Sequence, residues 1–292
     1  MSTIKKPFQF TGWLLALMIG AQCAAQAGDI ANEIKDVNEP SLSENGGFLE
    51  LGVVLDFRKS AFEQEDVADN DDVSVSTNLA ISAGYRYKRV FIEATESGFD
   101  GLNFGVTLLD SERWTVDMLL ANLAGNITVE SDEPPPPVTE AEKNLAILER
   151  DSLFIAAGTR VTGYFGESIL QFRVVSDWYD GNGLQGSARV GRQWQLGNWK
   201  LQGILGARVY SQRFSNYLFG ISEEEQSIRF PAYRAGAAVI PEGELALTIP
   251  LSENWVYVSR LGFRSYPGSV TKSPLIANSG TQYLNVGFHY VF

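Results

Sequence analysis

Apolar and polar residues alternate along most of the chain beyond residue 47. In the segment 73–87, for example, Val75 and Leu79 fall on one side of the alternation, and Ser76 and Asn78 fall on the other. A period of two residues is typical of a β-strand whose two faces meet different surroundings. This run is longer than the usual strand of about five or six residues, and it suits a tilted strand that crosses a bilayer.

The alternation predicts twelve strands whose connections are in turn long and short. A closed antiparallel transmembrane β-barrel with long extracellular loops and short periplasmic turns has this arrangement. Segments three and four could instead form one bent strand, so a smaller count of about ten stays open. The predicted strands are 48–58, 73–87, 89–97, 101–109, 112–124, 151–164, 167–178, 183–195, 198–212, 241–251, 254–265 and 281–292. The longest predicted loops are 59–72, 125–150, 213–240 and 266–280.

The first 27 residues have the features of a cleaved signal peptide. Lys5 and Lys6 precede a short apolar run, and Ala25-Gln26-Ala27 is a small-x-small cleavage site. The apolar run is too short for a membrane anchor, and Gln22 before Cys23 is a poor match to a lipidation site. We therefore predict a signal peptide at 1–27, a periplasmic segment at 28–47 and the barrel at 48–292.

Charged side chains separate strongly between the two faces of the predicted strands. Only Glu96 and Arg192 share the apolar face, whereas a cation at the membrane centre of a barrel's lipid face costs about 2–4 kcal/mol. The charged face must therefore line the lumen, whereas in a soluble β-sandwich the buried face would be the apolar one. The predicted lumen charges are Glu50, Asp56, Arg86, Glu93, Asp117, Arg160, Arg173, Asp177, Arg189, Lys200, Arg208, Glu244, Arg260 and Arg264.

Composition excludes some classes of function. The net charge of −12 argues against a nucleic-acid partner, because a phosphate backbone attracts basic surfaces. Beyond the signal, the chain has no run of 18 apolar residues, so helical spans are not expected. The predicted lumen set has a slight basic excess, which would favour anions if a small pore exists.

Aromatic residues mark the ends of several predicted strands, as in the aromatic girdles of outer-membrane barrels. The last strand carries Leu284, Val286, Phe288, Tyr290 and Phe292 on its lipid face. A terminal aromatic on an alternating strand resembles the signal read by the barrel assembly machinery, so Phe288, Tyr290 and Phe292 are the predicted assembly signal. The predicted girdle residues are Trp114, Trp178, Trp194, Trp199, Trp255, Tyr257 and Tyr290.

Several segments resemble the MipA/OmpV family of outer-membrane proteins. The most specific is Asn216-Tyr217-Leu218-Phe219-Gly220-Ile221-Ser222. Pro231-Ala232-Tyr233, Ser273-Pro274-Leu275-Ile276 and Leu148-Glu149-Arg150-Asp151-Ser152 match other family segments. Lys272 and the stretch Pro134–Pro137 depart from the family pattern. The candidate family-motif residues are Asn216, Tyr217, Phe219, Gly220, Ser222, Tyr233, Ser273 and Pro274.

The resemblance implies a non-enzymatic interaction role in the outer membrane. The family is named for a member that binds a lytic transglycosylase and a murein synthase, and other members resemble adhesins or antigens. A scaffold linked to murein turnover is therefore the leading hypothesis. A passive small-solute channel and a surface adhesin remain alternatives.

The sequence offers little for enzyme chemistry. Its one histidine, His289, has lumen parity close to the periplasmic end, where a lipid- or peptide-cleaving barrel would not place its base. An acidic cluster between Glu63 and Asp72 could bind a divalent cation, but a solvated loop fits its spacing better. We therefore predict no catalytic, cofactor-binding or metal-binding residues.

Overall fold

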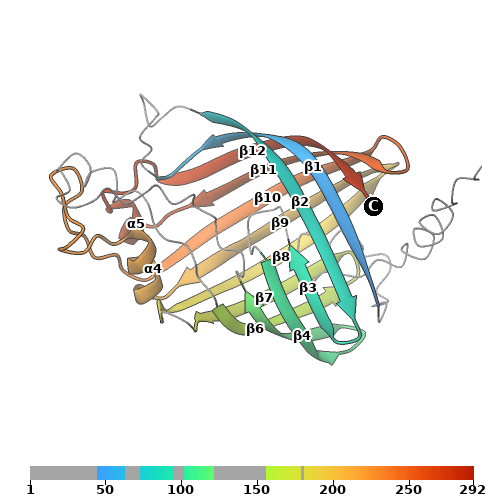
Figure 1. The fold of residues 1–292 in the computed structure, drawn as a ribbon, viewed down its shortest axis with the longest axis horizontal. Coiled ribbons are helices and arrows are strands. Elements are labelled where there is room, and N and C mark those ends of the chain that lie inside the picture. Colours follow the sequence, from blue (N-terminus) through green and yellow to red (C-terminus); the bar gives the residue numbers. More distant parts are fainter. Residues whose placement is uncertain (1–44, 63–72, 95–101, 122–155, 179–180) are drawn as a thin grey trace, which may run out of the picture.

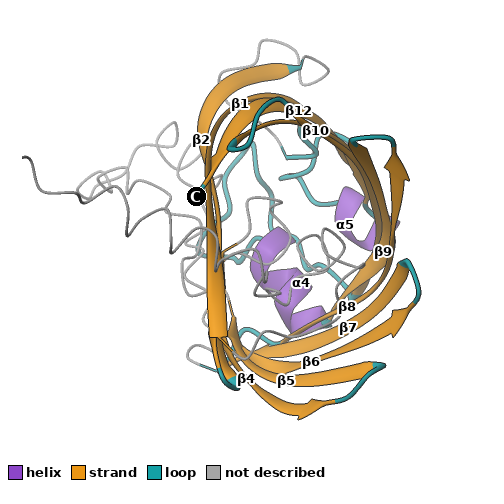
Figure 2. Cartoon of the chain, turned by 90° about the vertical axis from the view of Figure 1, so that its right-hand side faces the viewer, coloured by secondary structure: helices purple, strands orange, loops and turns teal. Residues whose placement is uncertain are grey.

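The structure, a computed structural model, describes residues 45–62, 73–94, 102–121, 156–178 and 181–292. These residues form one closed antiparallel barrel, in which each strand pairs with its sequence neighbours and β12 pairs with β1 (Figures 1 and 2). The predicted fold is confirmed. The predicted signal peptide, the acidic cluster, the tetraproline stretch, the 148–152 segment and Glu96 lie outside the described residues.

The strand count is twelve, because β3 and β4 are separate strands that pair with one another. The strands are β1 Asn45–Lys59, β2 Ser74–Tyr87, β3 Val90–Ala94, β4 Leu102–Asp110, β5 Trp114–Ala121, β6 Ala156–Phe165, β7 Ser168–Asp177, β8 Leu184–Leu196, β9 Trp199–Tyr210, β10 Ala238–Pro250, β11 Trp255–Ser265 and β12 Gly280–Val291.

Two strands begin three residues earlier than predicted. β1 begins at Asn45 and not at residue 48, because the residues from Asn45 onward already pair with β2. β10 begins at Ala238 and not at residue 241. Up to Pro241 this strand pairs with β9 alone, and pairing with β11 starts only at Glu242. A proline is tolerated where a strand has one neighbour.

The predicted loops 213–240 and 266–280 contain two helices, α4 at Gln212–Phe219 and α5 at Gly268–Thr271. Ser211 caps α4, since its Oγ accepts a hydrogen bond from the Phe214 amide at 3.3 Å. Viewed along the barrel, both helices lie within the ring of strands (Figure 2). No helix in the described part of the chain is long and apolar enough to cross a membrane.

The two faces of the strands differ as predicted. Outward positions are large, apolar and exposed, as with Leu79, Leu205 and Leu245. The predicted girdle tryptophans are also exposed, and the side chain of Trp178 is 76 % accessible. Inward positions are polar through the middle of the barrel and apolar near the end that holds α4 and α5. The interior therefore has two chemically distinct regions.

Candidate functional site

Arg160 on β6 is the centre of an ion-pair network on one side of the lumen. Its guanidinium lies 2.6 Å from Glu93 Oε1 on β3 and 3.0 Å from Asp117 Oδ2 on β5. All three side chains are almost fully buried. A buried charge needs a partner and further hydrogen bonds, and here one arginine joins three strands.

Neighbouring polar groups extend the Arg160 network around the wall. Thr107 donates to Asp117 at 2.7 Å and accepts from Arg86 at 2.7 Å. Asn103 donates to Glu93 at 3.1 Å. The connected side chains therefore come from β2, β3, β4, β5 and β6.

Phe91 is an aromatic residue inside this charged region. The guanidinium carbons of Arg86 and Arg160 lie 4.8 Å and 5.2 Å from its ring centroid. Gly105 on the neighbouring strand β4 pairs with Phe91, and a Cβ at Gly105 would overlap the ring. The missing side chain thus lets one aromatic ring pack between two cations, an arrangement that stabilises desolvated arginines.

Glu242 on β10 is the centre of a second network. Its carboxylate accepts from Arg189 Nε at 2.8 Å and from Arg208 Nε at 2.7 Å, and it lies 3.5 Å from Arg264 Nε. The three arginines come from β8, β9 and β11, so one carboxylate joins four strands. The sequence prediction omitted Glu242 from the lumen charges, although the residue lies within the predicted strand 241–251. Its position two residues before Glu244, on the same face, was the signal that could have identified it.

Two further contacts involve the last strand. The Tyr283 hydroxyl donates to Glu244 Oε2 at 2.6 Å. His289 is 1 % exposed, and its Nδ1 lies 2.8 Å from Glu50 Oε1 on β1. A Cβ at Gly52 would press against the imidazole, so the glycine makes room for the ring. The only histidine in the sequence thus packs where the first and last strands meet.

The remaining predicted lumen charges also lie on the inward faces of their strands. Asp56 pairs with Arg58 at 2.9 Å, and Asp177 accepts from the Asn182 amide at 3.0 Å. Twelve of the predicted residues are buried, and Lys200 and Arg264 are half-buried. The buried ones are Glu50, Asp56, Arg86, Glu93, Asp117, Arg160, Arg173, Asp177, Arg189, Arg208, Glu244 and Arg260.

An apolar cluster packs against the inner wall near the extracellular end, and we call it the outer plug. It joins inner-face residues of the strands to α4 and to the two long loops that follow β9 and β11. Tyr266, which follows β11, packs edge-on against Phe219 with ring centroids 5.8 Å apart. Burial there raises the pKa of the Tyr266 hydroxyl above its ordinary value. The buried members of the outer plug are Ala121, Ala156, Val175, Tyr210, Phe214, Phe219, Ala235, Ala238, Ile240, Val270 and Ile276.

The family-motif residues hold the loops of the outer plug together. Asn216 Oδ1 accepts from the Ala235 amide at 3.1 Å, and the Asn216 carbonyl accepts from the Gly220 amide at 2.8 Å. A Cβ at Gly220 would overlap Asn216, so the close approach requires glycine. Ser273 Oγ donates to the Phe219 carbonyl at 2.6 Å, which ties the last loop to α4.

The other motif residues lie at the edge of the outer plug. Tyr217 and Tyr233 pack against the buried cluster, and Tyr233 also donates to the Ser269 carbonyl at 3.0 Å. Ser222 is exposed, and Pro274 is half-buried beside Ser273. The structure therefore brings most of the motif into one packed unit, where its hydrogen bonds are internal.

A closed twelve-strand barrel with an apolar outer face and a charged interior defines an integral β-barrel protein of the bacterial outer membrane. The family model described as MltA-interacting protein MipA matches residues 51–292. The chain belongs to this family.

Individual relatives and solved structures are also similar to parts of the chain. The chain is 33% identical over 96 residues to the "Putative outer membrane protein YiaT" of Escherichia coli K12, and that match covers 32% of this chain and 39% of the relative. Among solved structures, an anion-selective porin from Comamonas acidovorans is 9% identical with a TM-score of 0.36, covering 85% of this chain and 99% of that one. The outer membrane channel DcaP of Acinetobacter baumannii is 7% identical with a TM-score of 0.38, covering 85% and 97%.

Proposed function

We propose that this protein is a non-enzymatic scaffold that holds enzymes of murein synthesis and turnover at the inner face of the outer membrane. The observation that carries the proposal is the outer plug, in which the motif residues Tyr217, Phe219 and Tyr233 pack inside the extracellular end of the barrel. Such an interior favours a rigid body that presents its surfaces to partners. The family's description as an MltA-interacting protein supports a murein-cleaving partner.

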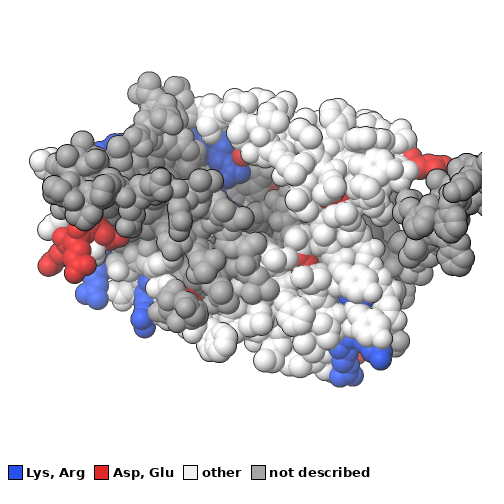
Figure 3. All heavy atoms as spheres, in the orientation of Figure 1, with Lys and Arg blue, Asp and Glu red and all other residues white. Residues whose placement is uncertain are grey.

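A basic patch at the periplasmic turns is the docking surface that we propose. Lys88 and Arg89 form the β2–β3 turn, and Arg113 lies in the neighbouring β4–β5 turn. All three are exposed, beside the exposed acidic residues Asp110 and Glu112 of the second turn, on a protein whose net charge is −12. Figure 3 shows basic side chains gathered where these turns lie. A basic patch on an acidic protein steers and orients a partner with an acidic surface.

Charge reversal of the patch tests the proposal. The variant Lys88→Glu/Arg89→Glu/Arg113→Glu should lose co-purification of a lytic transglycosylase from mild detergent at low salt. The matched control reverses three exposed cations of the outer loops, Arg229, Arg234 and Lys272, and should keep the enzyme bound. Failure of the unmodified protein to retain any murein enzyme would contradict the scaffold, and equal retention by both variants would contradict the patch.

A second candidate function, passage of small anions, rests on the charge of one side of the lumen. The described inner faces of β8–β11 carry five basic residues against two acidic ones, Glu242 and Glu244. This excess would attract anions. Planar-bilayer recordings separate the two candidates, since a plugged scaffold predicts no stepwise conductance and a channel predicts anion-selective steps. The five basic residues are Arg189, Lys200, Arg208, Arg260 and Arg264.

A further inference from the structure

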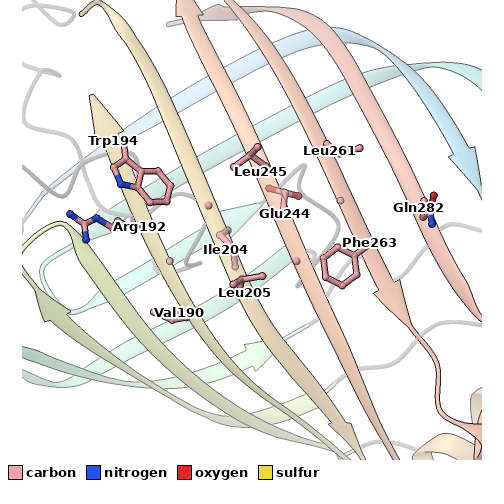
Figure 4. A pocket seen from close by; sticks show the side chains of 14 residues that line it. Val190, Arg192, Trp194, Ile204, Leu205, Glu244, Leu245, Leu261, Phe263 and Gln282 are labelled. Atoms are coloured by element: carbon pink, nitrogen blue, oxygen red, sulfur yellow. The ribbon is translucent and has the colours of Figure 1, made fainter. Parts of the chain in front are cut away.

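The outer wall of β8–β11 carries a groove of about 690 Å³ that opens on the membrane side (Figure 4). Leu205, Leu245, Leu261 and Phe263 line it, and all are exposed. On their strands these residues lie on the face opposite to the lumen residue Glu242 and its arginine partners. The groove therefore faces the acyl region of the bilayer.

Two outward-facing glycines produce the groove. Gly203 on β9 pairs with Leu245 on β10, and Gly243 on β10 pairs with Leu205 on β9. A Cβ at Gly203 would lie 3.1 Å from the Trp194 ring, and a Cβ at Gly243 would lie 2.6 Å from the Phe263 ring. A side chain at either position would push the neighbouring aromatic ring aside. Because both positions are glycine, the lipid-facing surface has a depression here.

A cation lies at the periplasmic end of the groove. Arg192 lines it four residues before the end of β8, and its guanidinium lies 2.9 Å from Glu167 in the β6–β7 turn. The Arg192 side chain is 51 % exposed, and it lies 5.8 Å from the ring of Trp194. A charge on the lipid parity is tolerated near the interface, where it reaches the headgroup level.

We propose that this groove binds one acyl chain of an inner-leaflet glycerophospholipid whose phosphate contacts Arg192. The groove is lined mostly by apolar side chains, with Gln282 at one end and the cation Arg192 at the other, which matches a molecule with an apolar chain and an anionic headgroup. Guanidinium binds phosphate through two parallel hydrogen bonds, and the periplasmic position of Arg192 selects the inner leaflet. Glu167 forms an ion pair with Arg192 and competes with the phosphate for it.

Native mass spectrometry of the purified full-length barrel, titrated with dioleoyl phosphatidylglycerol in detergent, tests the proposal. Arg192→Gln and Leu245→Trp should each weaken binding of the most tightly held lipid by about tenfold or more, because one removes the phosphate partner and the other fills the groove. Leu79→Trp, the same change on the exposed outer face of β2, and Lys272→Gln, an exposed cation of an outer loop and outside the groove, should leave it unchanged.

A gain of affinity distinguishes the proposal from a general loss of folding. Glu167→Gln removes the competing carboxylate and should tighten lipid binding severalfold, a result that a damaged barrel does not give. Unchanged lipid binding in both Arg192→Gln and Leu245→Trp would overturn the proposal. A stable dimer that dissociates only in Leu245→Trp would also overturn it, because the groove would then be an interface between two copies of the chain.

Discussion

The two ends of the barrel interior are stabilised by different chemistry. Near the extracellular end, α4 and the loops after β9 and β11 pack aromatic and aliphatic side chains onto the wall. Deeper in the barrel, Arg160 and Glu242 each join several strands through buried ion pairs. Both regions occupy the same inward parity. Inward parity therefore shows only that a position lies in the interior. Whether the residue there is apolar or charged depends on whether the outer loops pack against it.

The two regions should differ in how widely a defect spreads. Glu242 contacts arginines of strands on both sides of β10, so its loss affects the closure of the wall. The outer plug packs against inner-face residues of the wall, but its hydrogen bonds, such as Ser273 to Phe219, connect one loop to another. We expect damage to the charged networks to weaken the whole barrel and damage to the outer plug to stay local.

The largest effect is expected from Glu242→Gln. Loss of the carboxylate charge leaves Arg189 and Arg208 buried without their shared counter-ion, and breaking a buried ion pair costs about 3–5 kcal/mol. Urea unfolding of the barrel in lipid vesicles measures the change. Glu253→Gln, on the exposed β10–β11 turn, is the control and should change stability little. Equal stability of the two variants would show that the Glu242 network does not brace the wall.

Phe219→Ala tests the outer plug. Phe219 is 2 % exposed and contacts the rings of Tyr210, Tyr266 and Phe62. Its loss should cost the packed loops about 3–5 kcal/mol, as for a buried phenylalanine elsewhere. We expect rapid protease cleavage of the outer loops with a small change in barrel unfolding.

The control for this variant is Phe172→Ala on the exposed outer face of β7, which should leave cleavage of the loops unchanged. If Phe219→Ala lowers barrel stability as much as Glu242→Gln does, then the outer plug and the wall form one cooperative unit, and the contrast between them fails.

Sequence alone predicted the wall of this barrel far better than its interior contacts. Strict alternation placed all the predicted lumen charges on the inward side of their strands. Successive side chains of a strand point to opposite faces, so one residue faces lipid and the next faces the lumen. The partners of Arg160 could not be predicted, since Glu93 and Asp117 reach it only through strand neighbours and stagger. The outer plug was also hidden, because the segment 213–240 has no alternation. Only the family resemblance identified Asn216 and Gly220, without showing that they are packed inside.

A pair of glycines sharpens the account of the outer plug. Gly220→Ala would press a methyl group against Asn216 and should destabilise the packed loops by about 1–3 kcal/mol. Gly268, in the other outer loop, has open space around the same added carbon, and Gly268→Ala should be neutral or stabilising by less than about 1 kcal/mol. Protease protection of the loops measures both. Equal protection would mean that the Asn216 contact adjusts at no cost.

The smallest effect is expected from Arg192→Gln measured in lipid-free detergent. Arg192 and Glu167 form an ion pair like those inside the barrel, but their side chains are 51 % and 59 % exposed. Solvent screens such pairs, so the loss should change barrel stability by less than about 1 kcal/mol, and a double-mutant cycle with Glu167→Gln should give a similarly small coupling. If Arg192→Gln lowered barrel stability as much as Glu242→Gln does, solvent exposure would not explain the difference between the surface ion pair and the buried ones. If Arg192→Gln loses little barrel stability in detergent but much of its phospholipid binding, then Arg192 serves lipid binding rather than the stability of the fold.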